Sequence, residues 1–236
     1  FTTVEMQSSS NMFIGFDLRD KHLSHKRVRQ AIAYAINNQD IVDSIYNGSA
    51  TVATSPIPKI TTGHNENSNP YEQNIEKAKE LLAEAGYPNG FDIVLNVNED
   101  NQRVDTAVVI QDNLKAIGIN VQIKTYQWAS YVAFVENPSQ EKGMFLMAWN
   151  IANDDPDELL YPLYHSSQID AHTNVIFYKN EQFDKLILEA RRMADKEKRM
   201  KMYKEAQDII QEDLPHYTLV YPKQNFAFKS NIKGIE

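Results

Sequence analysis

Cysteine is absent from this chain of 236 residues, and its absence excludes several kinds of site. Without thiols the chain has no disulfide, no zinc–thiolate centre and no cysteine nucleophile. A protein that works outside the cytoplasm fits this composition, although many cytosolic proteins lack cysteine too.

Long apolar runs are missing as well. No stretch approaches the ~18 consecutive apolar residues that a membrane-spanning helix needs. The opening residues 1–6, FTTVEM, have neither the basic start nor the apolar run of a signal peptide, and they lack an initiator methionine. These features predict an excised fragment whose targeting signal lies outside it.

Positive charge is the third shortage, with 24 Lys and Arg against 32 Asp and Glu and a net charge of −8. This balance argues against a nucleic-acid partner, because binding to phosphates needs clustered Lys and Arg. Glycine-rich phosphate loops are absent too, so we expect no nucleotide and no other cofactor. The remaining composition, 42% hydrophobic and 24% charged, is typical of a soluble globular protein with a sizeable core.

Apolar periodicity predicts an alternation of strands and helices. The predicted strands are 11–18, 91–97, 119–126, 143–149, 218–221 and 225–228, and the predicted helices are 25–36, 40–46, 74–85, 102–117, 128–135, 183–193 and 195–210. The strand–helix–strand order between 91 and 126 is typical of a crossover unit with two neighbouring parallel strands. The long irregular passage 49–69 is expected to be functional or to wrap a surface. One α/β domain accounts for residues 12–228.

The most informative segment is 144–164, MFLMAWNIANDDPDELLYPLY. A short apolar strand ends at Trp149, a polar loop with several aspartates follows, and an aromatic-rich helix comes next. Ligands of open α/β sheets gather at the carboxyl ends of strands, and an indole with several carboxylates suits a polar organic ligand. This loop is therefore the candidate ligand site.

The acidic residues of this loop are Asp154, Asp155, Asp157 and Glu158. Capping of the following helix is the favoured interpretation, since carboxylates are stabilised at a helix N-terminus. Contact with a cation, either a hard metal or a ligand ammonium group, comes second and is compatible with capping. Paired-carboxylate catalysis comes last, because no nucleophile elbow or Ser/His/Asp arrangement accompanies these residues, and no catalytic residue is assigned.

The two tryptophans, Trp128 and Trp149, each adjoin a predicted strand. Trp128 follows the strand 119–126, and Trp149 ends the strand 143–149. If these strands are parallel neighbours, both indoles point towards the same edge of the sheet. A binding wall and ordinary core packing are then about equally expected.

Arg103 stands at the start of a predicted helix, after a polar loop. Its guanidinium has the geometry to bind a ligand carboxylate in bidentate fashion. An ion pair with nearby Glu99, Asp100 or Asp105 is the favoured interpretation.

Among the six histidines, His22 with His25 and His165 with His172 are the pairs that could approach a common metal ion. A metal site usually needs three convergent ligands, and neither pair has an evident third. We expect these four histidines to be ordinary surface residues, and we predict no metal site.

Five segments carry a resemblance to a known family. They are HKRVRQAIAYAINNQDIVDSIYNGSA (25–50), IEKAKELLAEAGYPNGFDIVL (75–95), IQDNLKAIGINVQIKTYQW (110–128), MAWNIANDDPDELLYPLYHSS (147–167) and RRMADKEKRMKMYKEAQDIIQEDLPHYTLVY (191–221). In this order, and over nearly the whole chain, they closely resemble the family 5 extracellular solute-binding proteins, the oligopeptide- and dipeptide-binding components of bacterial ABC importers.

The resemblance implies an α/β fold, namely a periplasmic-binding-protein-like (type II) lobe with a mixed, largely parallel sheet flanked by helices. It implies that residues 1–236 form a single lobe, the carboxyl-side lobe of a two-lobed protein, with hinge segments near 1–12 and 229–236. The amino-terminal lobe, the signal peptide and the lipid-anchor cysteine of many members would lie outside this chain.

The implied function is the capture of di- or oligopeptides outside the cytoplasm, in the periplasm or at the cell surface, by a lipid-anchored protein that is not an enzyme. The implied partners are the peptide, the missing amino-terminal lobe and the membrane permease of the ABC transporter, with no nucleic acid. Two alternatives stay open: the same transporter class with a non-peptide solute such as a metal chelate, and a hydrolase that uses Asp154 and Asp155.

The resemblance also implies ligand-binding residues. Tryptophans that match Trp128 and Trp149 line the ligand cleft of peptide-binding members. The aspartate that usually pairs with the peptide ammonium is replaced here by Ala152, so either Asp154 or Asp155 takes that role or the ligand is not a free-amino peptide. Arg103 lies near the place where some dipeptide-binding members hold a ligand carboxylate. The expected ligand-binding set is Trp128, Trp149, Asn150, Asn153, Asp154, Asp155 and Arg103.

Overall fold

The computed structural model describes residues 1–66 and 71–232. Residues 67–70 of the predicted irregular passage and residues 233–236 of the second predicted hinge segment lie outside the described residues. The strands are β1 (Thr2–Gln7), β2 (Ser10–Phe16), β3 (Ala50–Val52), β4 (Asp92–Asn98), β5 (Asn120–Tyr126), β6 (Met144–Asn150) and β7 (His216–Phe228). The helices are α1 (Lys26–Ala35), α2 (Asn38–Ser44), α3 (Ile75–Glu84), α4 (Asn101–Lys115), α5 (Trp128–Glu136), α6 (Asp157–Tyr164), α7 (Glu181–Arg192) and α8 (Lys196–Asp213), with a short 3₁₀ helix at Ser166–Gln168.

The strands form one mixed sheet in the order β1-β7-β2-β6-β4-β5, with β3 paired to β7. Strand β4 runs parallel to both β5 and β6, whereas the other pairings of the described strands are antiparallel. The predicted mixed α/β sheet flanked by helices is confirmed, but its pairings are mostly antiparallel rather than largely parallel. Parallel strands need crossover connections, and here α4 joins β4 to β5 while α5 joins β5 to β6.

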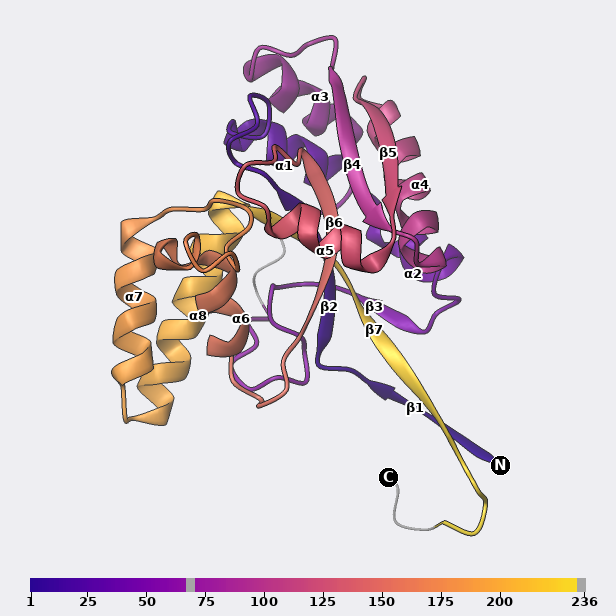
Figure 1. Ribbon diagram of the computed structural model, residues 1–236, viewed down its shortest axis with the longest axis vertical. Helices are drawn as coiled ribbons and strands as arrows, with labels where there is room; N and C mark the ends of the chain where they lie inside the picture. Colours follow the sequence, from indigo (N-terminus) through magenta and orange to yellow (C-terminus); the bar gives the residue numbers. More distant parts are fainter. Residues whose placement is uncertain (67–70, 233–236) are drawn as a thin grey trace.

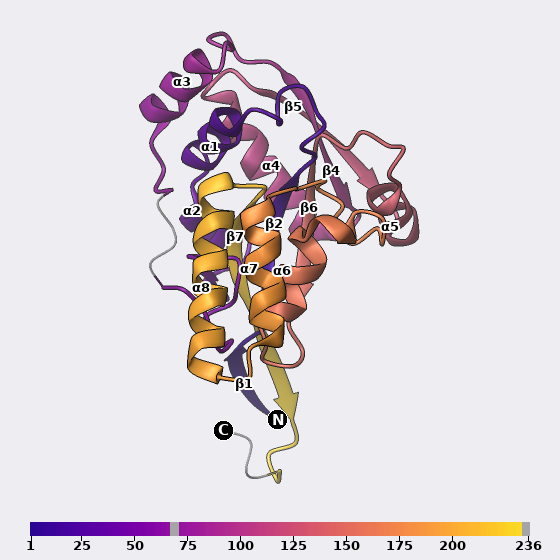
Figure 2. The ribbon, with the colours of Figure 1, turned by 90° about the vertical axis from the view of Figure 1, so that its left-hand side faces the viewer.

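Helices cover both faces of the sheet (Figure 1). Helices α1 to α4 pack on one face, and α5 to α8 lie on the other. Figure 2 shows α7 and α8 side by side as an antiparallel pair. The sheet therefore separates two apolar cores, each with its own helical layer.

The alternation of side chains along β2 and β6 supplies both cores. Met12 and Ile14 of β2 and Leu146 of β6 are buried in the core under α1 to α4. Phe13 of β2 and Phe145 of β6 are buried in the other core. Because successive side chains of a strand point to opposite faces, these central strands are apolar at consecutive positions.

The edges of the fold differ from the sequence expectation. The predicted strands 218–221 and 225–228 are parts of the single strand β7, which continues through Pro222. A strand tolerates proline where the ladder does not need its N–H, and the Pro222 carbonyl accepts a hydrogen bond from Ser8 Oγ at 2.6 Å. Strand β1 is absent from the strands predicted by periodicity, and its residues are mostly exposed.

The described part of the passage 49–69 wraps α8. Wrapping a surface was one of the two roles expected for it. Gln207 of α8 is buried and makes three contacts with this passage. Its Nε2 donates to the Gly63 carbonyl at 2.8 Å, and its Oε1 accepts from Ser55 Oγ at 2.9 Å and from the Asn65 N–H at 3.2 Å. The passage predicted as irregular contains one short strand, β3, paired to β7. Beyond this strand, one buried amide anchors the described residues 53–66, which form no helix or strand.

Gly15 allows a close approach between β2 and β6. It pairs with Phe145 in the antiparallel ladder, and the aromatic ring lies directly over it. A Cβ added at Gly15 would lie 2.2 Å from Phe145 Cζ, which is well inside van der Waals contact. The missing side chain is therefore what allows the ring to lie across the neighbouring strand.

Gly15→Ala is expected to lower the free energy of unfolding by about 1–3 kcal/mol, because the new methyl group overlaps the Phe145 ring. Urea unfolding followed by circular dichroism measures the change. Phe145→Leu is the matched partner: if ring overlap is the cause, the double variant loses less stability than the two single variants together. Fully additive losses would contradict this explanation.

Candidate functional site

The two tryptophans meet at one edge of the sheet. The sequence interpretation treated β5 and β6 as possible neighbours. They are not neighbours, because β4 lies between them. Both strands nevertheless run parallel to β4, so their carboxyl ends reach the same edge. Trp128 begins α5 just after β5, and Trp149 lies at the end of β6.

Both indoles line one cavity of about 330 Å³. Its wall is mainly apolar, and its lining residues are Phe13, Trp128, Val132, Val135, Glu136, Phe145, Met147, Ala148, Trp149, Leu163, His172, Thr173, Val175, Ile176 and His216. We call this space the apolar cavity. Its volume lies at the lower end of the range of about 300–1,000 Å³ that ligand pockets occupy.

Several wall residues follow from simple spacing, although the sequence interpretation did not include them. Val132 and Val135 follow Trp128 by one and two turns of α5, so they share its face. Phe145 and Met147 precede Trp149 at every second position of β6. Helical and strand periodicity, started from each tryptophan, would have found these residues.

Trp149 is held in place at both its backbone and its ring. Its N–H donates to Asn11 Oδ1 at 3.2 Å, and the indole Nε1 donates to the Glu158 carbonyl at 3.0 Å. Trp128 is 51% exposed. Trp149 is thus a fixed wall, and Trp128 presents a large apolar surface to solvent.

A second cavity, of about 340 Å³, lies on the other side of Trp128. Trp128 and Ala148 line both cavities, and Arg103 lines the second. The Arg103 guanidinium lies 5.6 Å from the Trp128 ring centroid, and Nη1 donates to Asn98 Oδ1 at 2.8 Å. We call this space the arginine cavity.

Arg103 makes no ion pair with a carboxylate in the described part of the chain. The favoured interpretation, a pair with Glu99, Asp100 or Asp105, is therefore wrong. Asp100 instead accepts the Arg103 backbone N–H at 3.1 Å and caps α4. The guanidinium keeps its positive charge available beside the cavity.

The aspartates of the acidic loop already have partners. Asp154 accepts hydrogen bonds from the Thr62 hydroxyl and backbone N–H at 2.7 and 2.6 Å, and these bonds lower the pKa of its carboxyl. Asp155 forms an ion pair with Arg199 at 2.8 Å and accepts the Asp157 N–H at 3.0 Å. Asp155 thus accepts the first N–H of α6, in line with the favoured interpretation, although the N-cap residue itself, Pro156, makes no side-chain hydrogen bond to the helix.

Glu158 and Asn150 hold the two ends of this loop. Glu158 Oε2 accepts the backbone N–H groups of Ala152 and Asn153, each at 2.9 Å. Asn150 Oδ1 accepts from the hydroxyls of Ser9 and Ser10 at 3.0 and 3.2 Å.

Among the predicted ligand-binding residues, the structure brings together Trp128, Trp149 and Arg103. Asn150, Asn153, Asp154 and Asp155 line neither cavity.

His216 is a buried polar residue in the lining of the apolar cavity. Its ring stacks on Phe13 with centroids 4.5 Å apart. The Tyr164 hydroxyl lies 2.6 Å from Nδ1, and the Thr218 hydroxyl lies 2.9 Å from Nε2. Burial lowers the His216 pKa to about 3, so the imidazole is neutral near pH 7.

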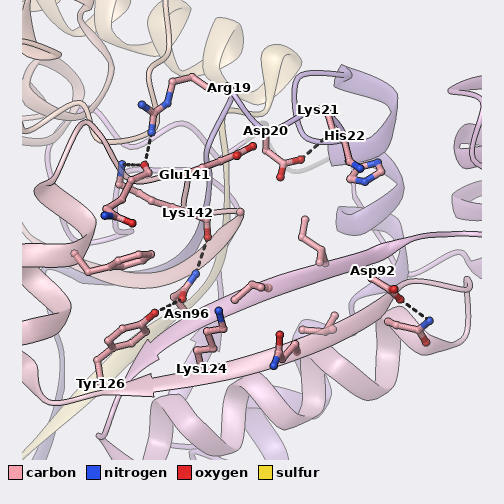
Figure 3. Close-up of a pocket in the computed structure, with 18 residues that line it drawn as sticks. Arg19, Asp20, Lys21, His22, Asp92, Asn96, Lys124, Tyr126, Glu141 and Lys142 are labelled. Atoms are coloured by element: carbon pink, nitrogen blue, oxygen red, sulfur yellow. Dashed lines mark hydrogen bonds between the residues drawn. The ribbon is translucent and has the colours of Figure 1, made fainter.

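A larger, polar depression of about 1,080 Å³ lies on the open face of β4 and β5 (Figure 3). Some of its polar groups pair with one another. Asn96 donates to the Lys142 carbonyl at 2.6 Å and accepts from the Tyr126 hydroxyl at 3.0 Å, and Asp92 accepts from Asn120 at 2.9 Å. Neither tryptophan lines this depression, so the two smaller cavities are the stronger candidate site.

Two of the histidines expected at the surface are buried. His22 stacks on Phe91 at 4.0 Å, and burial lowers its pKa. His165 is also buried, and its Nδ1 accepts the Ser167 N–H at 3.2 Å.

No group of three His, Asp or Glu side chains in the described ranges is arranged to hold a metal ion. No helix of the described part has both the length and the apolar character to cross a membrane.

The fold is an α/β sheet with two cavities around a tryptophan at the carboxyl ends of its parallel strands, which is where ligands of α/β proteins usually bind. Residues 2–171 match the model of the bacterial extracellular solute-binding proteins, family 5 Middle. The chain belongs to this family, which confirms the resemblance seen in the sequence.

Known relatives are solute-binding proteins. The chain is 32% identical to heme-binding protein A of Haemophilus influenzae, over 98% of this chain and 43% of that protein. It is 32% identical to the oligopeptide-binding protein AppA of Bacillus subtilis, over 95% of this chain and 44% of that protein. The solved structure of the periplasmic binding protein DppA of Helicobacter pylori, in complex with the peptide STSA, superimposes with a TM-score of 0.87 at 35% identity, covering 94% of this chain and 44% of that one. The chain thus spans less than half the length of these relatives.

Replacement of Glu158 tests how the acidic loop is held. Glu158→Ala is expected to lower the free energy of unfolding by about 1–2 kcal/mol, because two backbone N–H groups lose a charged acceptor. Glu158→Gln retains an acceptor oxygen, so it should lose less. Urea unfolding measures the loss of stability in each variant. Equal losses in both variants would contradict the role of the carboxylate as acceptor.

The buried His216 predicts a pH dependence of stability. Between about pH 6.5 and about pH 3 the unfolded chain binds a proton at this imidazole that the folded chain does not. The free energy of unfolding should therefore fall as the pH falls through this window, by up to about 1.4 kcal/mol per pH unit from this group. In His216→Gln the free energy of unfolding should change less steeply with pH, as measured by urea unfolding between pH 7 and pH 4.5.

His172→Gln is the control for this experiment, because the His172 ring lies exposed at the rim of the same cavity. The slope should be unchanged in this variant. An unchanged slope in His216→Gln would show that the buried imidazole does not resist protonation.

Proposed function

We propose that this chain is one lobe of a solute-binding protein that captures peptides outside the cytoplasm and delivers them to the permease of an ABC importer. Membership of family 5 supports the solute-binding role. Two relatives support the peptide as solute: AppA is an oligopeptide-binding protein, and the Helicobacter pylori DppA structure contains a bound peptide.

One observation carries the proposal: Trp128 lines both an apolar cavity and a cavity lined by Arg103, whose guanidinium forms no ion pair among the described residues. A peptide offers apolar side chains and a terminal carboxylate on one short backbone. The indoles supply flat apolar walls, and Arg103 supplies a charge that suits a carboxylate. Asp154 and Asp155 are already bonded to Thr62 and Arg199, so the proposal rests on Trp128, Trp149 and Arg103.

The lobe supplies one wall of the site, and a second lobe would supply the other. We propose that β1 and the distal half of β7, which pair as a ribbon that projects from the body (Figure 1), belong to the connection between the lobes. The hinge segments would then lie near 1–12 and 229–236. Closure of the lobes would be stabilised by a ligand that binds the closed state more tightly.

We propose a binding protein rather than an enzyme. Hydrolysis by two carboxylates needs one protonated and one ionised group. Hydrogen bonds from Thr62 lower the pKa of Asp154, which favours its ionised form, and Asp155 is already held in an ion pair with Arg199. The full-length protein would be anchored by a lipid in the periplasm or at the cell surface.

The full-length, two-lobed protein is expected to bind free-carboxylate peptides with a Kd below about 1 mM in isothermal titration calorimetry, whereas this chain alone should bind weakly or undetectably. Arg103→Gln should weaken binding of these peptides by about 10-fold to 100-fold, because a charged hydrogen bond is lost. C-terminally amidated peptides should be affected much less.

Arg192→Gln, on the exposed surface of α7, is the matched control and should leave affinity unchanged. Absence of peptide binding by the two-lobed protein would refute the proposal, and binding of a metal chelate alone would favour the alternative solute. Tight binding by this chain alone would contradict the two-lobed clamp.

A further inference from the structure

We infer that the apolar cavity selects an uncharged, apolar side chain of the bound peptide; this inference rests on the proposed function. The cavity favours such a side chain because its walls are apolar and its described interior has no free hydrogen-bonding or charged group. Its volume, its walls and the hydrogen bonds of its buried polar residue all bear on this choice.

The cavity has room for a large side chain. Its volume is about 330 Å³, and a dry apolar cavity of about 150 Å³ is enough to hold a benzene molecule. Val132 and Val135 of α5 form one wall, Phe145 and Met147 of β6 form another, and Val175 and Ile176 contribute a third. A leucine or phenylalanine side chain would exchange contact with water for contact with these groups.

His216 leaves the interior of the cavity without a free hydrogen-bonding group. Its two ring nitrogens are within hydrogen-bonding distance of the hydroxyls of Tyr164 and Thr218, and one ring face is stacked on Phe13. The residue is 2% exposed. A charged or polar side chain that entered the cavity would find no free partner on this residue.

The other polar residues of the lining lie towards solvent. Glu136 and His172 are exposed, and Thr173 is half-buried. His172 Nδ1 contacts the Glu136 carbonyl at 3.1 Å, which joins the end of α5 to the loop before Val175. No Lys or Arg is part of this lining in the described ranges. The interior therefore offers no countercharge to an acidic side chain and no buried carboxylate to a basic one.

The full-length protein and a set of tripeptides test this selectivity. Alanine, leucine, phenylalanine, lysine or glutamate is placed at each position in turn of a trialanine with free ends, and Kd is measured by calorimetry. At one position, leucine or phenylalanine should bind at least about 10-fold tighter than alanine, because each added methylene gains contact in an apolar pocket. Lysine and glutamate should bind no tighter than alanine at that position.

Variants of Val132 connect the selectivity to this cavity. Val132→Phe fills the space and should remove most of the preference for phenylalanine over alanine. Val132→Glu places a carboxylate in the wall, so it should weaken the phenylalanine peptide and strengthen the lysine peptide. Val108→Glu is the matched control, since Val108 is 44% exposed on α4 and lines neither cavity; its preferences should match those of the unmodified protein.

The outcomes separate this inference from the proposed function. If no peptide of the set binds, the proposed function fails together with the inference. If peptides bind but every side chain gives the same affinity, or lysine or glutamate binds tightest, only the selectivity is overturned. A preference for phenylalanine that survives Val132→Phe and Val132→Glu would place the selective pocket elsewhere and overturn the inference too.

Discussion

The packing of β6 on both faces is the constraint on which the rest of the structure depends. Leu146 lies in the core under α1 to α4, while Phe145 lies in the opposite core. A shift of the strand by one residue would exchange the two faces and move Trp149 away from the cavity. Gly15 helps to fix this register, because the Phe145 ring lies over the one residue of β2 that has no side chain to oppose it.

The site forms where this strand ends. Past Trp149 the chain leaves the two cores and enters a polar loop, whose side chains bind the loop to its surroundings. Asp154 connects it to Thr62, and Asp155 connects it to Arg199. Asp154 and Asp155 therefore stabilise the loop beside the candidate site. Trp128, Trp149 and Arg103 line the cavities that a ligand can occupy.

Much of the architecture was predictable from the sequence, because local apolar spacing decides which face of an element is buried. The helices 25–36, 74–85 and 102–117 were found within a few residues of α1, α3 and α4. The parallel pair β4–β5 followed from its crossover helix. The directions of the remaining strands did not, since an antiparallel ladder between distant segments leaves no mark on the spacing within either one.

The sequence by itself determined the family, the main elements and the position of both tryptophans next to strand ends, because each depends on residues that are close together in the chain. Only the tertiary structure decided the partners of the charged groups. Asp154 and Thr62 are 92 residues apart in the sequence, and Asp155 and Arg199 are 44 apart. Arg103, by contrast, has acidic neighbours in sequence yet forms an ion pair with none of them among the described residues. Long-range hydrogen bonds and ion pairs are set by how the elements pack, so the sequence could suggest capping by the acidic loop but could not identify Thr62 and Arg199 as the partners of its aspartates.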